Sequence, residues 1–132
     1  MATPRPDTRP LLSAKLPVEP DAGARARKVL AKMARLVDHD TFDDLQLLTT
    51  ELVTNAVRHG GGPVQVEAWL LMDSVFVEVT DPGPGFDIPD FEPRHSGPHG
   101  WGLRLVSDMS DRWGVARDGA THVWFELARA AA

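Results

Sequence analysis

Residues 64–80 read VQVEAWLLMDSVFVEVT, and this stretch decides the fold. Apolar and polar residues alternate over 64–69 and again over 75–80, which is the period of a strand with one buried face. The pair Asp73-Ser74 lies between the two runs and predicts a tight turn. A turn this short joins antiparallel strands, so the stretch predicts a β-hairpin.

Two helical patterns precede the hairpin. The first runs from Asp21 to about Asp38, where apolar residues recur at helical spacing and Asp21 stands at the capping position. Residues 21–40 carry five basic side chains against three acidic ones. This surface is either an ordinary solvated helix face or a contact surface for an acidic partner.

The second helix is predicted to run from Phe42 or Asp43 to His59. Thr41 or Asp40 would cap its first turn, because short polar side chains accept hydrogen bonds from the free N–H groups there. Three consecutive glycines follow the helix and end it firmly.

Further strands are predicted at both ends of the domain. Residues 12–18 alternate loosely and could form a first strand, and Pro17 would place this strand at a sheet edge or end it early. After a helix at 103–110, residues 113–115 and 122–127 predict two last strands. Hairpins outnumber crossovers, so we expect an α+β fold. It is a two-layer sandwich in which helices cover one face of a mixed, mostly antiparallel sheet.

The 132-residue length predicts one domain. We expect a disordered proline-rich arm over 1–10, the folded domain over 11–128 and a frayed tail over 129–132.

Lysine and arginine total 14 against 19 acidic residues, for a formal net charge of -5. That balance argues against nucleic acid as a partner, because phosphate neutralisation needs a basic face.

Several other classes are excluded by composition. The chain has no cysteine, which rules out disulfide scaffolds and thiolate metal sites and fits a reducing compartment. It shows neither a signal peptide nor an apolar run of the ~20 residues that a membrane-spanning helix needs. We therefore expect a cytoplasmic protein without a membrane partner.

A polar stripe marks the second helix. Glu51, Asn55 and His59 stand four residues apart, and Arg58 lies on the same stripe, beside the apolar sector. Carboxylate and amide oxygens suit a hard cation such as Mg²⁺, and a carboxylate can also accept a proton from an attacking hydroxyl. The plain alternative is a polar helix edge with an ordinary i,i+4 pair.

Two glycine-rich motifs follow the hairpin. The run DPGPG at 81–85 sets an acid at a strand end before an unobstructed backbone, which suits a flat ligand with an exocyclic amine such as adenine. The run GPHGWGL at 97–103 places glycines immediately before the next helix, where free N–H groups favour phosphate. Taken separately, each is equally an ordinary turn or linker.

In combination, these motifs resemble the ATP-binding boxes of the GHKL (histidine-kinase-like) ATPase superfamily. The three boxes are ELVTNAVRHG, then DPGPGF, then GPHGWGL, and the short domain with a closing GATHVWFEL looks most like anti-sigma-factor serine/threonine kinases. The resemblance covers about residues 11–128. It implies the family's Bergerat-type sandwich, in agreement with the order of elements above.

The resemblance also implies an ATP site that contains Mg²⁺. By analogy, Asn55 binds the metal, Glu51 is the general base, and Asp81 accepts a hydrogen bond from the adenine amino group. Residues 86–98 correspond to the ATP lid. The other nucleotide-contacting residues that it implies are Gly83, Gly85, Phe86, Gly97, Gly100, Trp101, Gly102, Leu103 and Thr121.

The function expected from this family type is phosphorylation of an anti-sigma-factor antagonist. The kinase would then control a sigma factor by partner switching, and a homodimer is a possible assembly. Two other functions stay open: a non-catalytic nucleotide- or partner-binding module, and a detached histidine-kinase ATPase domain. The last would need a separate dimerisation protein, since this sequence shows no phosphoacceptor helix.

Overall fold

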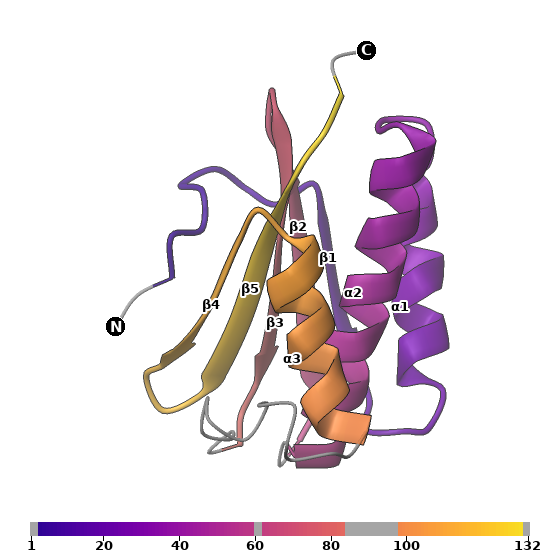
Figure 1. Ribbon diagram of the computed structural model, residues 1–132. Helices are drawn as coiled ribbons and strands as arrows, with labels where there is room; N and C mark the ends of the chain where they lie inside the picture. The colour runs from indigo at the N-terminus through magenta and orange to yellow at the C-terminus, as the bar shows by residue number, and fades with distance from the viewer. Residues whose placement is uncertain (1–2, 60–61, 84–97, 131–132) are drawn as a thin grey trace.

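The structure is a computed structural model that describes residues 3–59, 62–83 and 98–130, with only the backbone described for 98–102. Figure 1 shows a sheet with helices packed along one side of it. The elements in chain order are β1 (Leu12–Leu16), α1 (Ala22–Leu30), the 3₁₀ helix η1 (Ala31–Met33), α2 (His39–His59), β2 (Val64–Leu70), β3 (Ser74–Asp81), α3 (Pro98–Met109), β4 (Arg112–Arg117) and β5 (Thr121–Ala128).

The sheet confirms the predicted hairpin and the predicted fold class. Its strand order is β1-β2-β3-β5-β4, and every described pairing is antiparallel. The backbone N–H of Leu71 donates to the carbonyl of Ser74 at 2.8 Å and closes the turn between β2 and β3. β1 forms one edge and ends at Leu16, immediately before Pro17, as expected for a strand that cannot continue through proline.

Strand alternation divides the sheet into two faces. The face toward the helices is apolar, and alternate residues of β3 such as Val75, Val77 and Val79 are buried there. The helices supply the opposite half of this core, mainly with Leu30, Met33, Leu45, Leu48, Leu52, Val53, Leu103 and Val106. The other face, which we call the open face, bears charged and aromatic side chains.

The helix boundaries differ from the prediction at two places before the hairpin. α1 ends at Leu30 and tightens into η1, instead of continuing to Asp38, and this turn buries Met33. α2 begins at His39, because Asp38 Oδ2 accepts the N–H of Thr41 at 3.1 Å. Neither Thr41 nor Asp40 is therefore the cap.

Helix α3 begins earlier than predicted. It starts at Pro98, so Gly100 and Gly102 lie inside its first turns instead of in a loop before it. Proline suits the first turn of a helix because that turn has no partner for the missing N–H. The prediction began the helix after these glycines because glycine has a low helix propensity.

The terminal segments contact the folded domain. Of the arm expected over 1–10, residues 3–10 are described and lie against the open face, where Trp69 Nε1 donates to the carbonyl of Thr8 at 2.9 Å. At the other end, Arg129 Nε donates to the carbonyl of Leu71 at 2.9 Å, which holds the start of the expected frayed tail. No described helix combines the length and apolar character that crossing a bilayer requires.

Candidate functional site

Three elements that carry the predicted motifs end or begin at the same end of the molecule. Figure 1 shows the last turns of α2, the first turns of α3 and the end of β3 together at the lower edge of the view. Residues 84–97, which connect β3 to α3, lie outside the described residues, and so do the predicted site residues Gly85, Phe86 and Gly97.

Asp81 is buried at the end of β3 and braces the turn that follows. The residue is 3% exposed, and Oδ1 accepts the N–H of Gly83 at 2.8 Å. Thr121 lies directly opposite on β5, and its hydroxyl donates to the Gly83 carbonyl at 3.1 Å. Asp81, Gly83 and Thr121 therefore form one bonded unit beside the predicted adenine position.

The bond from Thr121 to Gly83 was not anticipated from the sequence. The resemblance assigns Thr121 to the nucleotide, and in the structure its buried hydroxyl also donates to the turn. The signal for this role is the cross-strand register that pairs Thr121 with Asp81, and that register appears only when the sheet is assembled.

Burial raises the pKa of Asp81 above its ordinary value of 3.8. The hydrogen bond from Gly83 and the nearby His122 and His59 act in the opposite direction without cancelling the effect of burial. Burial makes the charged form of a carboxylate costly, so a further hydrogen-bond donor stabilises that form. An exocyclic amine is such a donor.

The polar stripe of α2 lies at the edge of the core, as predicted. Glu51 is half-buried, and Asn55, one turn later, is 3% exposed. Among the described residues, Nδ2 of Asn55 has no hydrogen-bond partner. Buried amides are almost always hydrogen-bonded, so this one indicates a partner that the described residues do not supply.

The oxygen ligands on this stripe fit a hard cation that also binds the phosphates of a nucleotide. Rotating the Asn55 amide by half a turn would place its oxygen where the unpartnered nitrogen stands, and Mg²⁺ prefers such oxygen ligands while keeping several waters. The described residues contain no cluster of three or more acidic or histidine side chains that could hold a metal alone. Asn55 therefore suits a metal whose other ligands come from a nucleotide and water.

The structure describes the residues predicted to contact phosphate to different extents. Leu103, predicted to contact phosphate, is 1% exposed and belongs to the hydrophobic core. Gly100, Trp101 and Gly102 are placed only by their backbone, in the first turns of α3. The first turn of a helix offers N–H groups without intrahelical partners and a positive dipole end, and the start of α3 lies at the same end of the molecule as the last turns of α2 (Figure 1).

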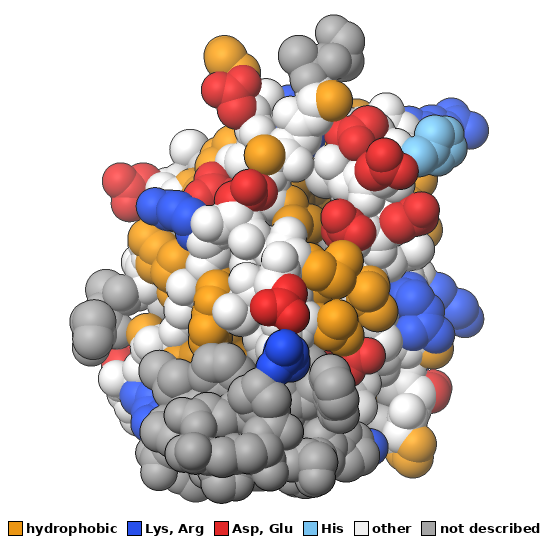
Figure 2. Space-filling view, in the orientation of Figure 1, with side chains coloured by type: hydrophobic (Ala, Val, Ile, Leu, Met, Phe, Trp, Pro, Cys, Tyr) orange, Lys and Arg blue, Asp and Glu red, His pale blue; other side chains and the backbone are white. Residues whose placement is uncertain are grey.

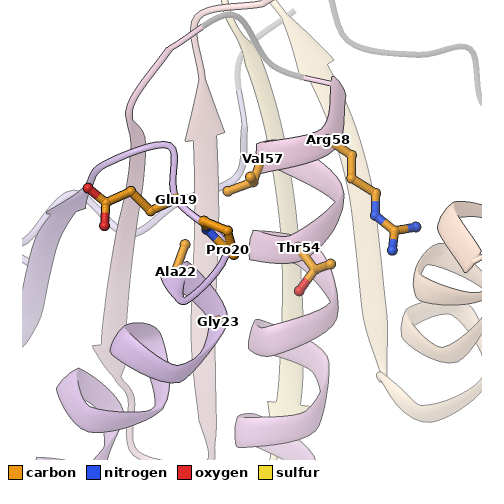
Figure 3. Close-up of a pocket in the computed structure, with 7 residues that line it drawn as sticks. All are labelled: Glu19, Pro20, Ala22, Gly23, Thr54, Val57 and Arg58. Atoms are coloured by element: carbon orange, nitrogen blue, oxygen red, sulfur yellow. The ribbon is translucent and has the colours of Figure 1, made fainter.

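A groove next to this site was missed in the sequence. It encloses about 280 Å³ between the start of α1 and the last turns of α2 (Figure 3). Figure 3 shows Arg58 extending away from α1 on the far side of α2. The lining residues are Glu19, Pro20, Ala22, Gly23, Thr54, Val57 and Arg58, none of which belongs to the predicted nucleotide site.

Comparison with known proteins decides the family. Residues 16–127 match the model of the histidine kinase-like ATPase domain. The chain belongs to this family. The match covers every helix and strand of the fold except the first residues of β1 and the last residue of β5.

Curated relatives of this family member carry the name serine-protein kinase RsbW. The protein from Bacillus licheniformis is 28% identical over 128 residues, which cover 83% of this chain and 80% of that protein. The protein from Oceanobacillus iheyensis is 24% identical over 116 residues, with 74% and 73% covered.

Solved structures of histidine kinases show the same fold. The histidine kinase domain of a blue-light-activated histidine kinase from Erythrobacter litoralis superposes with a TM-score of 0.57 at 20% identity, covering 84% of this chain and 60% of that one. Full-length ShkA in complex with AMPPNP superposes with a TM-score of 0.55 at 23% identity, covering 90% of this chain and 32% of that one. This chain therefore spans 60% and about a third of the lengths of these two solved chains.

Proposed function

We propose that this protein is an ATP-dependent protein serine/threonine kinase of the anti-sigma-factor type. In this role it would phosphorylate an anti-sigma-factor antagonist and control a sigma factor by partner switching. The observation that carries the proposal is the buried amide of Asn55, which has no partner among the described residues and stands one turn after Glu51. The family match and the relatives named serine-protein kinase support the same conclusion.

The adenine end of the site is assigned to the unit around Asp81. Oδ1 accepts the N–H of Gly83, and we assign Oδ2 to the exocyclic amine of adenine. Guanine presents a carbonyl oxygen at the corresponding position, so the carboxylate would reject it. The rigid turn held by Thr121 supports this selectivity, because it fixes the direction of the acceptor.

Two residues of α2 would act at the phosphate end. Asn55 is the residue that would hold Mg²⁺, which supplies charge neutralisation at the phosphates when bound. Glu51 would accept the proton of the serine or threonine hydroxyl as that oxygen attacks the γ-phosphorus. The bond from phosphorus to the bridging oxygen breaks, and ADP leaves with that oxygen.

The test compares transfer of the γ-phosphoryl group by the wild-type protein and by a matched variant. The wild-type protein and Glu51→Gln are incubated with Mg²⁺, ATP labelled at the γ-phosphate, and cytosolic extract from the native host. Wild type is expected to label a discrete protein on serine or threonine, and Glu51→Gln to bind ATP normally while labelling at least a hundredfold more slowly.

The alternatives give different results in the same experiment. Nucleotide binding without any labelled acceptor would identify a non-catalytic module. Labelling of histidine instead would identify a detached histidine-kinase domain. Labelling by Glu51→Gln at the wild-type rate would contradict the role given to Glu51.

A further inference from the structure

We propose that the open face of the sheet is a binding site for an extended, proline-rich protein segment that carries an arginine. The chain's own residues 3–10, which we call the arm, occupy this site as a tethered ligand. A partner segment of the same chemistry would bind when the arm is displaced. The site lies on the opposite side of the sheet from the helices and is independent of the proposed kinase activity.

The site is built around two like charges. Glu67 on β2 and Glu78 on β3 are direct cross-strand partners on the open face. They are 9% and 1% exposed. Like charges directly opposite each other destabilise a sheet, and buried carboxylates are costly unless a cation pairs with them. This pair is therefore suited to a positively charged ligand.

The arm supplies that cation from the other end of the sequence. Arg5 Nη1 lies 3.3 Å from Glu67 Oε1 and 3.3 Å from Glu78 Oε2. His122 contributes a further contact, with Nδ1 3.4 Å from Glu78 Oε2. Oε1 of Glu78 still has no hydrogen-bond partner among the described residues. A single guanidinium nitrogen shared by two carboxylates leaves acceptor capacity in the site.

Aromatic rings form the floor of the site. The guanidinium carbon of Arg5 lies 5.1 Å from the centre of the Trp69 ring, a cation–π distance. Phe76 meets Trp69 edge-on at 5.6 Å and stacks with Trp124 at 5.4 Å. Trp69 and Phe76 are each 1% exposed, although the described helices all lie on the other face (Figure 1). The arm contacts Trp69 through Arg5 and Thr8, and Phe76 is packed between Trp69 and Trp124.

One contact recognises the backbone of the occupant instead of its side chains. Trp69 Nε1 donates to the carbonyl of Thr8 at 2.9 Å, and any extended segment offers such a carbonyl. Prolines in the arm favour the extended polyproline conformation and lower the entropy lost on binding. The site would therefore select arginine through the carboxylates and tolerate variation at the neighbouring positions.

The arm is attached in a way that allows displacement. It continues directly into β1, where the N–H of Leu11 donates to the carbonyl of Ala68 at 2.8 Å. A short tether gives the arm an effective concentration on the order of millimolar, so a free segment must compete with it. The side chain of Arg5 is 44% exposed, which means that a competitor can reach the guanidinium.

The arm also offers a matched control. Arg9 precedes a proline and is exposed, as Arg5 is, but among the described residues it is Arg5 that contacts the carboxylates. Replacing Arg9 by alanine changes the net charge and the arm composition as much as replacing Arg5 does. Only the loss of Arg5 should open the site.

The experiment measures binding of a free peptide to the full chain. A fluorescein-labelled peptide of residues 3–10, TPRPDTRP, is titrated by fluorescence polarisation with wild type, Arg5→Ala and Arg9→Ala. We expect Arg5→Ala to bind the peptide at least tenfold more tightly than wild type and Arg9→Ala do. Adding Glu78→Gln to Arg5→Ala, or Arg5→Ala to the peptide, should reverse the gain.

Several results would overturn the proposal. Equal affinity of wild type and Arg5→Ala would do so, as would undiminished binding of the peptide without its Arg5 equivalent. If Arg5→Ala does not fold, Arg5→Lys keeps the charge but loses the guanidinium fork, and no gain over wild type would count equally against it. A wild-type dimer that dissociates on Arg5→Ala would place the arm on a second copy and refute occupancy within one chain.

Discussion

Strand β3 carries a buried carboxylate on each face of the sheet, and the two are satisfied differently. Glu78 on the open face is paired with the guanidinium of Arg5 and with His122. Asp81, at the end of the strand, accepts a hydrogen bond from the uncharged N–H of Gly83. The chain thus brings a full positive charge to one acid and a backbone dipole to the other.

This difference indicates which kind of ligand each face of the sheet binds. Burial dominates at Asp81 and raises its pKa, so an outside donor would relieve the cost of its charge. Glu78 already has a cation, but that cation belongs to the arm, and no residue of the arm is part of the hydrophobic core. We infer that one face is set for a nucleotide and the other for an arginine-bearing segment. Four predictions test this contrast.

The largest effect is expected on nucleotide affinity. Asp81→Asn should raise the Kd for Mg-ATP by roughly 10- to 150-fold, or about 1.5–3 kcal/mol, because the amide that replaces the free oxygen repels the adenine amine. The Kd is measured by intrinsic tryptophan fluorescence.

The matched control is the acid on the other face of the same strand. Glu78→Gln should change the Kd for ATP by less than about twofold, since its effects are confined to the open face. A comparable loss of ATP affinity in both variants would mean that the two faces do not act separately.

The next effect concerns stability. Arg5→Ala should lower the free energy of unfolding by about 1–2 kcal/mol, less than the ~3–5 kcal/mol for a fully buried pair, because Arg5 is 44% exposed. Urea denaturation gives the value. In a Glu67→Gln, Glu78→Gln background the same substitution should cost much less, whereas an unchanged cost would show that the charges are not what holds the arm.

A smaller effect is expected from the backbone contact of the arm. Trp69→Phe keeps an aromatic ring but removes the indole N–H that reaches Thr8, and should cost about 0.5–1.5 kcal/mol. Amide exchange over residues 3–9 should accelerate in this variant. In Trp124→Phe, whose ring stacks on Phe76, exchange over these residues should stay as in wild type. Faster exchange in both would point to general loosening of the face.

The smallest effect is a pH dependence. Since burial raises the pKa of Asp81 above 3.8, this acid takes up a proton at a higher pH than an exposed one. ATP affinity should therefore weaken as the pH falls toward that pKa, while Asp81→Asn loses this dependence. The effect on stability has the opposite sign, because the cost of charged Asp81 is present above the folded pKa and absent below 3.8. Parallel pH profiles of Kd for both proteins would count against the assignment.

Sequence patterns predicted the parts of this fold that depend on neighbouring residues. Alternation over 64–80 located the central hairpin, and helical spacing located α2 with its Glu51 and Asn55 stripe. The motif at 81–85 correctly placed Asp81 at a strand end. Each of these features repeats or stops within a few residues, which is the range over which periodicity carries information.

The parts that were missed depend on residues far apart in the chain. Arg5 and Glu78 are separated by 73 positions, and only the assembled sheet shows that the arm lies on it. Asp38 serves two partners, the N–H of Thr41 at the start of α2 and the N–H of Ala130 near the C-terminus. Figure 2 shows the acidic side chains gathered where α2 begins, among which the sequence alone did not select Asp38 as the cap.

Isothermal titration calorimetry of the wild-type protein with ATP and then GTP, each with Mg²⁺, tests the central claim most directly. We predict heat of binding for ATP, at least tenfold weaker binding for GTP, and loss of this preference in Asp81→Asn. Equal affinity for the two nucleotides, or no binding of either to folded protein, would contradict the assignment of Asp81 as the acceptor for adenine.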